Sequence, residues 1–164
     1  MNAPIKFIII GLSCAFISTA QADLTTSTFQ VLLTITKACS VTSGTPITFT
    51  PVASTSGRVT AHADISVNCS KDTPYTIGLS PSNSDLNGSG VLAGTLSTNT
   101  DKVPYQLAKD ASGTVWGSDV GTSSIIVSSK GTGGAQPFTV YAVVANANFT
   151  ADSYSDTVTV KLNY

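Results

Sequence analysis

The sequence contains no glutamate, and its only methionine is Met1. Charged residues make up 10% of the 164 residues, whereas about 25% is usual in soluble proteins. The formal net charge is −1, so the chain lacks the strongly basic character with which proteins bind nucleic acid or anionic lipid. We therefore expect no nucleic-acid partner. Threonine, valine, serine and glycine dominate instead, which favours β-structure over helix.

Histidine is nearly absent as well, because His62 is the only one. A Ser-His-Asp triad would have to use this residue, and zinc or copper sites in β-sandwiches usually need several histidines. His62 alternates with Ala61 and Ala63 in a strand-like run, so we expect it to face solvent. The acidic residues are all aspartates, mostly in turn-like stretches that need no catalytic explanation. We predict no catalytic residues, no metal site, no cofactor and no small-molecule substrate.

No apolar run reaches the roughly 20 residues that a membrane-spanning helix needs. The first apolar run, residues 7–16, follows Lys6 and precedes Ala20-Gln21-Ala22, a small-residue site suited to signal-peptide cleavage. This order is typical of a secretory signal peptide, which we place at residues 1–22. The mature chain is then expected to begin at Asp23 and to enter an oxidising compartment.

Only two cysteines remain after cleavage, because Cys14 lies in the predicted signal peptide. In an exported protein, Cys39 and Cys69 are expected to form a disulfide. Closing a loop of about 30 residues stabilises a fold by about 3–4 kcal/mol in the chain-entropy treatment. The competing interpretation is a metal site, but beyond these two thiolates only His62 could serve as a further ligand.

Strand-like runs recur along the mature chain, separated by clusters of Gly, Pro, Ser, Asn and Asp. Seven to nine short strands without a credible helix predict an all-β, immunoglobulin-like antiparallel β-sandwich. The runs are residues 28–36, 39–42, 46–50, 58–69, 74–80, 91–96, 102–108, 114–117, 123–128, 136–145 and 155–164.

The run at 28–36 is strongly amphipathic and lies just behind the predicted cleavage site. At period 2 it places four apolar side chains on one face: Phe29, Val31, Leu33 and Ile35. Periodicity alone favours a strand that completes its own sandwich, whereas a free strand this apolar would invite pairing with another chain. The last run has a similar apolar face, made of Val158, Val160, Leu162 and Tyr164.

Several motifs occur in the order found in one known family. The terminal Tyr154-x-Asp156-Thr157-Val158-x-Val160-x-Leu162-x-Tyr164 resembles the last strand of the spore coat protein U domain, which also builds the archaic (Csu-type) chaperone-usher pilins. Further stations resemble the family in sequence order: Thr28-Phe29-x-Val31, Cys39-x-Val41, Val67-x-Cys69, Val103-Pro104-Tyr105-x-Leu107, Trp116-Gly117 and Gln136-Pro137-Phe138-x-Val140-Tyr141.

The resemblance implies a sandwich that lacks its last strand. After the signal peptide at 1–22, it implies a donor-strand extension at 23–38 and a pilin domain at 39–164. The donor-strand plugs would then be Phe29, Val31, Leu33 and Ile35. The acceptor groove would be lined by Val158, Val160, Leu162 and Tyr164. A disulfide between Cys39 and Cys69 would join the strands that border this groove. The implied partners are a periplasmic chaperone, an outer-membrane usher and other pilin subunits. The implied destination, through the periplasm, is a cell-surface pilus that supports adhesion and biofilm formation.

Within that family we expect a polymerising shaft or minor subunit, because a tip adhesin would need a second domain in front. The alternative is a monomeric secreted β-sandwich, either a binding module or a spore-coat-type structural protein. A binding module would show an exposed aromatic platform built around Trp116, Tyr105 or Tyr141. A lone tryptophan in a β-sandwich more often packs in the core or at its rim. A hydrolase would require His62 to be needed for activity.

Overall fold

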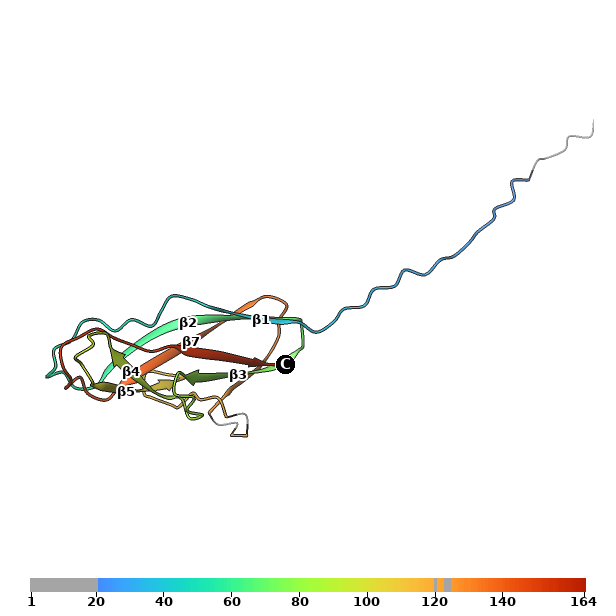
Figure 1. Ribbon diagram of the computed structural model, residues 1–164. Coiled ribbons are helices and arrows are strands. Elements are labelled where there is room, and N and C mark those ends of the chain that lie inside the picture. Colours follow the sequence, from blue (N-terminus) through green and yellow to red (C-terminus); the bar gives the residue numbers. More distant parts are fainter. Residues whose placement is uncertain (1–20, 120, 123–124) are drawn as a thin grey trace, which may run out of the picture. The chain divides into compact units, whose positions relative to one another are not determined.

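The computed structural model describes residues 21–119, 121–122 and 125–164 (Figure 1). Nearly all of the predicted signal peptide, residues 1–20, lies outside the described residues. The chain divides into two units, residues 1–34 and 35–164. The first unit forms no strand over its described residues, and the second contains every strand named below. Among the described residues, no helix is long and apolar enough to cross a membrane.

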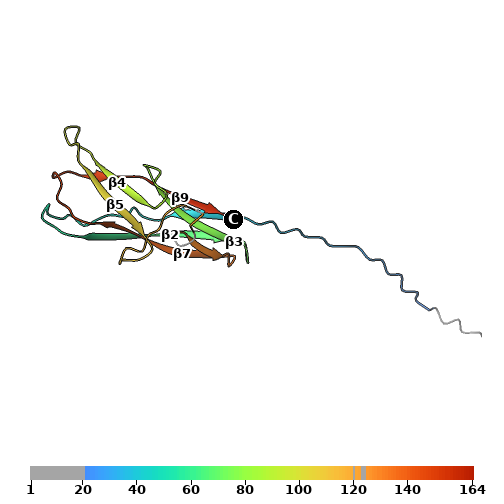
Figure 2. The same cartoon turned by 90° about the horizontal axis from the view of Figure 1, so that it is seen from below.

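The second unit is an all-β antiparallel sandwich of two sheets, which confirms the predicted fold class (Figures 1 and 2). The larger sheet has the order β1-β2-β7-β5-β4-β8, and the smaller has the order β6-β3-β9. Their bounds are β1 Cys39–Ser43, β2 Val59–Cys69, β3 Pro74–Pro81, β4 Ser89–Gly94, β5 Lys102–Ala108, β6 Val127–Lys130, β7 Ala135–Val144, β8 Tyr154–Ser155 and β9 Val158–Asn163.

The central pair of the larger sheet, β2 and β7, forms because both strands place an apolar residue at every second position along most of their length. They pair without interruption from Val59 opposite Val144 to Asn68 opposite Ala135. In β2 the alternation buries Ile65, Val67 and Cys69 in the core. The same alternation leaves the outer face of the strand polar.

The core lies between the sheets and includes the chain's single tryptophan. Trp116 is 1% exposed, and its indole N–H donates a hydrogen bond to the carbonyl of Ile77 at 3.0 Å. The same core cluster includes Val67, Tyr75, Ile77, Leu79, Tyr105, Leu107, Val140 and Ala142. The prediction that Trp116 serves packing is therefore confirmed. Tyr105 is also buried, at 6%, so these two residues cannot form an exposed aromatic platform.

Within the sandwich, the strands predicted at 46–50, 114–117 and 123–128 are wrong or shortened. Residues 46–50 form no ladder, because Pro46 and Pro51 bracket them and lack the backbone N–H that a ladder requires. Residues 114–117 make only an isolated bridge, between Val115 and Ala108. The strand expected at 123–128 begins at Val127, and residues 123–124 lie outside the described residues.

The last predicted strand, 155–164, is divided in two. β8 pairs with β4 in the larger sheet, whereas β9 pairs with β3 in the smaller one. The chain changes sheets at Asp156 and Thr157, which lie between the two strands. We call these two residues the sheet switch. They deliver β9 to one edge of the smaller sheet.

Candidate functional site

The two sheets leave a seam between the edge strands β1 and β9. Among the described residues each of these strands has a hydrogen-bonded neighbour strand on one side only, β2 for β1 and β3 for β9. Both views place the C-terminal end of β9 beside β1 (Figures 1 and 2). Two free edges therefore run along the same side of the sandwich, where unpaired N–H and C=O groups are available to another strand.

Apolar side chains along this seam are only half covered. In β9 the inward residues Val158, Val160 and Leu162 are partly buried and pack against the core, while Thr159 and Lys161 between them are exposed. Cys39 and Val41 of β1, together with Ile47 and Phe49, are partly buried in the same way. The core is thus incompletely covered along the line where β1 and β9 face each other.

A cleft of about 120 Å³ opens in this seam. Its walls come from both sheets and from the loop after β1, and they are mostly apolar. The side chains that define it are Ile47, Leu79, Leu107, Val140, Val158 and Val160. We call the cleft and the half-covered residues of β1 and β9 the seam groove. A strand laid along it would find apolar contacts below and backbone partners on both sides.

The predicted acceptor residues are distributed over this groove unequally. Val158 and Val160 line the cleft itself. Leu162 lies on the same face of β9, opposite Ile77 of β3, and packs against the core without lining the cleft. Tyr164 follows the end of β9 and is 62% exposed.

The predicted donor residues lie in a stretch without secondary structure, because residues 21–38 form no strand. Phe29, Val31, Leu33 and Ile35 are all exposed, by 80–88%. Leu32, which breaks their alternation, is exposed as well. A lone extended segment has no ladder partner, so the strand expected at 28–36 does not form here.

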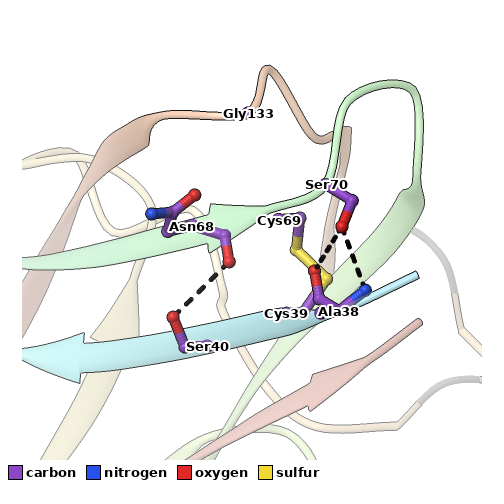
Figure 3. Close-up of a pocket in the computed structure, with 7 residues that line it drawn as sticks. All are labelled: Ala38, Cys39, Ser40, Asn68, Cys69, Ser70 and Gly133. Atoms are coloured by element: carbon purple, nitrogen blue, oxygen red, sulfur yellow. Dashed lines mark hydrogen bonds between the residues drawn. A yellow bond between two sulfur atoms is a disulfide. The ribbon is translucent and has the colours of Figure 1, made fainter. Parts of the chain in front are cut away.

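The disulfide joins β1 to β2 at one end of the groove (Figure 3). Cys39 and Cys69 are directly opposite each other in the ladder, and their Cα atoms are 4.1 Å apart. Ser70 extends this attachment, because its backbone N–H donates to the carbonyl of Ala38 at 2.9 Å and its hydroxyl accepts the Ala38 N–H at 3.1 Å. The first residue of β1 is therefore fixed covalently and the residue before it by hydrogen bonds.

A surface recess of about 340 Å³ lies over the disulfide, between β1 and the turns that follow β2 and β6. Figure 3 shows its lining residues: Ala38, Cys39, Ser40, Asn68, Cys69, Ser70 and Gly133. The lining offers neither a charged side chain nor a cluster of ligands. We assign it no chemistry of its own.

Other candidate chemistry is sparse. His62 is exposed on the outer face of β2, as predicted, where its ring is 5.3 Å from that of Tyr141 on the neighbouring strand. In the part of the chain that the structure describes, no group of three or more His, Cys, Asp or Glu side chains could hold a metal ion.

Sequence reasoning missed the residues that hold β8 and the sheet switch. Asp152, just before β8, accepts hydrogen bonds from Thr95, the Leu96 N–H, Asn99 and the Ser153 N–H, at 2.7–3.0 Å. Tyr105 of β5 donates to the carboxylate of Asp156 at 2.7 Å. The only available signal was the Asp-Thr pair in the terminal motif, because these contacts join residues about 50 positions apart.

Asp152 gives a testable pH dependence. Desolvation alone would raise its pKa, but the hydrogen bonds from Leu96, Asn99, Thr95 and Ser153 outweigh it and lower the pKa to about 2. A pKa below the unfolded value stabilises the fold at higher pH, and this stabilisation is lost as pH falls from about 4 towards 2. We expect Asp152→Asn to lower the melting temperature by a few degrees at pH 6 and to have little effect near pH 2. Circular dichroism melts of both proteins between pH 2 and 6 measure this, and parallel pH profiles would contradict it.

The fold and the seam groove define an immunoglobulin-like β-sandwich whose core is open between two sheet edges. The chain belongs to the spore coat protein U domain family, whose model matches residues 25–161. No curated protein is significantly similar to it in sequence.

Two solved structures match this chain over most of its length. One is the CsuC–CsuE chaperone–tip adhesion subunit pre-assembly complex from the archaic chaperone-usher Csu pili of Acinetobacter baumannii, with TM-score 0.55 and 20% identity over 80% of this chain. The other is a chaperone–tip adhesin complex of CFA/I fimbriae, with TM-score 0.45 and 10% identity over 76% of this chain. The chain spans 41% of the matched chain in each case.

Proposed function

We propose that the chain is a structural subunit of a surface pilus, assembled by the chaperone-usher route through donor-strand exchange. The observation that carries this proposal is the seam groove, where half-covered apolar side chains lie between two sheet edges without a neighbouring strand. A β-sandwich open in this way is complete once one more strand enters. The role is structural rather than enzymatic.

The exposed segment at 28–36 has the composition that such a groove requires. Its four apolar side chains repeat at period 2, so all four face the same way when the segment is extended. Full burial would contribute about 1.5–3 kcal/mol for each, or roughly 6–12 kcal/mol in total. Backbone pairing adds about 0.5–1.5 kcal/mol for each hydrogen bond. The conformational entropy lost when the segment becomes ordered offsets part of this stabilisation.

The geometry of such a contact leads to a filament. Donor segment and groove are different surfaces of the same molecule, so the contact between two copies is head-to-tail and does not close on itself. Each added copy presents a new groove or a new donor segment. Partners are therefore other copies of this chain or related pilin subunits.

In the cell, assembly would be guided by proteins that are not part of the fibre. A subunit with an open groove exposes apolar surface and strand edges, which favour aggregation. A periplasmic chaperone would cover the groove after export, and an outer-membrane usher would exchange the chaperone for the next subunit's donor segment. The finished pilus would lie on the cell surface and support adhesion and biofilm formation.

The proposal predicts a specific behaviour on denaturing gels. Junctions made by an inserted strand should survive sodium dodecyl sulfate at room temperature and dissociate on heating, because the buried ladder is kinetically protected. Native material from the cell surface should therefore run as a ladder of multiples unheated and as one band after boiling. A single monomer band in both lanes, from protein that is folded and oxidised, would overturn the proposal.

A further inference from the structure

The strand that forms one wall of the seam groove, β9, begins at a point held by a residue of the larger sheet. The sheet switch, Asp156 and Thr157, separates β8 from β9, so its position sets where β9 starts along β3. The first inward residue after it is Val158, which lines the cleft. A displacement at the switch would therefore move the groove wall directly.

Tyr105 holds this switch from the larger sheet. Its ring lies over Gly90 of β4, where a Cβ atom would overlap the ring, so a side chain at that position would displace it. The hydroxyl donates a 2.7 Å hydrogen bond to one oxygen of Asp156, and the other oxygen accepts the backbone N–H of Thr157 at 2.8 Å. One carboxylate thus links a buried tyrosine to the backbone of the switch.

The Tyr105 hydroxyl keeps its proton and can therefore donate this hydrogen bond to Asp156. Burial raises the pKa of Tyr105 above the ordinary tyrosine value, and the hydrogen bond and negative charge of Asp156 raise it further. Hydrogen bonds to a charged acceptor are stronger than neutral ones. Two residues further along β5, Leu107 lines the cleft itself, so the same strand contributes both a groove wall and the contact with the switch.

We propose that Tyr105 is a positioning residue for the seam groove, which presets the course of β9 by holding Asp156 before an incoming strand arrives. This inference rests on the proposed function, since it concerns how well the groove accepts a strand. A preset groove binds faster and more tightly than one that must be ordered on binding. Tyr105→Phe removes the hydroxyl and keeps the ring over Gly90.

The test uses the full mature chain with Leu33→Asp, which leaves the groove intact while spoiling its own donor segment. The probe is a labelled synthetic peptide of residues 24–38, and its dissociation rate is measured by fluorescence anisotropy. We expect Tyr105→Phe to speed dissociation by about 3- to 10-fold, the range that one lost hydrogen bond gives. Asp156→Ala should do the same, whereas Asp156→Asn keeps one of the two acceptor oxygens and loses the charge, so its dissociation rate should lie between those of Asp156→Ala and the parent.

Two control variants separate positioning from general stability. Tyr75→Phe removes a buried hydroxyl that has no hydrogen-bond partner in the structure. Tyr154→Phe removes a hydroxyl that donates to the Thr150 carbonyl at 2.7 Å and accepts from Asn99 at 2.9 Å, and it leaves the contact between Tyr105 and Asp156 in place. Both should bind the peptide like the parent, even where Tyr154→Phe lowers the melting temperature as much as Tyr105→Phe.

Each outcome decides a different point. Peptide binding by the parent with unchanged dissociation for Tyr105→Phe overturns the positioning role and leaves the proposed function standing. Dissociation rates that follow melting temperature across all the variants also overturn it, because stability alone then explains them. A parent chain that folds but does not bind the peptide overturns both proposals.

Discussion

Leu33→Asp and Val160→Asp should each abolish self-assembly of the mature chain. Leu33 is exposed in the isolated chain and would be buried in the proposed junction, and Val160 lines the cleft that would receive the donor strand. An aspartate at either position would place an unpaired carboxylate in an apolar contact, which costs on the order of several kcal/mol. Both positions are at least partly exposed before assembly, so the single chains should still fold. Unheated gels and electron microscopy of the purified proteins measure the loss.

Each of these variants has a matched control one position away. Leu32→Asp puts the charge on the opposite face of the donor segment, and Thr159→Asp puts it on the exposed face of β9. Both should polymerise like the unaltered chain. If Leu32→Asp blocks assembly as strongly as Leu33→Asp, the predicted donor face is wrong.

Mixing the two blocked variants gives the sharper result. Leu33→Asp retains an intact groove, and Val160→Asp retains an intact donor segment, so an equal mixture can form one junction and no more. We expect heterodimers that survive detergent at room temperature, with no longer species. Long polymers from the mixture, or no dimer at all, would contradict head-to-tail strand donation between these two surfaces.

The sequence predicts best where one face of a strand is packed on the core. The inward positions of β2 and β7 follow the predicted alternation closely, because side chains such as Val67, Val140 and Ala142 are buried in the core. Trp116 was predictable as a packing residue for a similar reason, since a lone large aromatic is most stable where it is covered. These features depend on burial, and the local spacing of apolar residues in the sequence reflects burial directly.

The seam groove was harder to predict from the spacing of apolar residues in the sequence. The pattern from Tyr154 to Tyr164 is interrupted only by Asp156, which occupies an apolar position, and this single residue does not predict that the chain changes sheets there. Ile47 lines the cleft from a stretch that forms no strand, and its alternation with Phe49 suggested a ladder that the flanking prolines prevent. Which edges remain open follows from topology, and topology depends on pairings between distant residues. The donor and acceptor assignments therefore stay predictions.

The disulfide makes the second large prediction, because β1 has little else to hold it. β1 is five residues long, pairs with β2 alone, and forms one border of the seam groove. The bond between Cys39 and Cys69 closes 30 residues of chain. Replacing both cysteines by alanine should lower the free energy of unfolding by about 3–4 kcal/mol.

The expected consequence for assembly is larger than the loss of stability alone. Without the covalent bond, β1 can separate from β2, and the groove then loses a wall and half of its backbone partners. We expect the double alanine variant to give no detergent-resistant ladder at 37 °C, and denaturant titration to give the loss of stability. Ser40→Ala, which removes only a 3.5 Å hydroxyl contact with the Asn68 carbonyl in the same ladder, should leave both unchanged. A double variant that unfolds within about 1 kcal/mol of the parent and still forms heat-labile ladders would show that β1 stays in place without the bond.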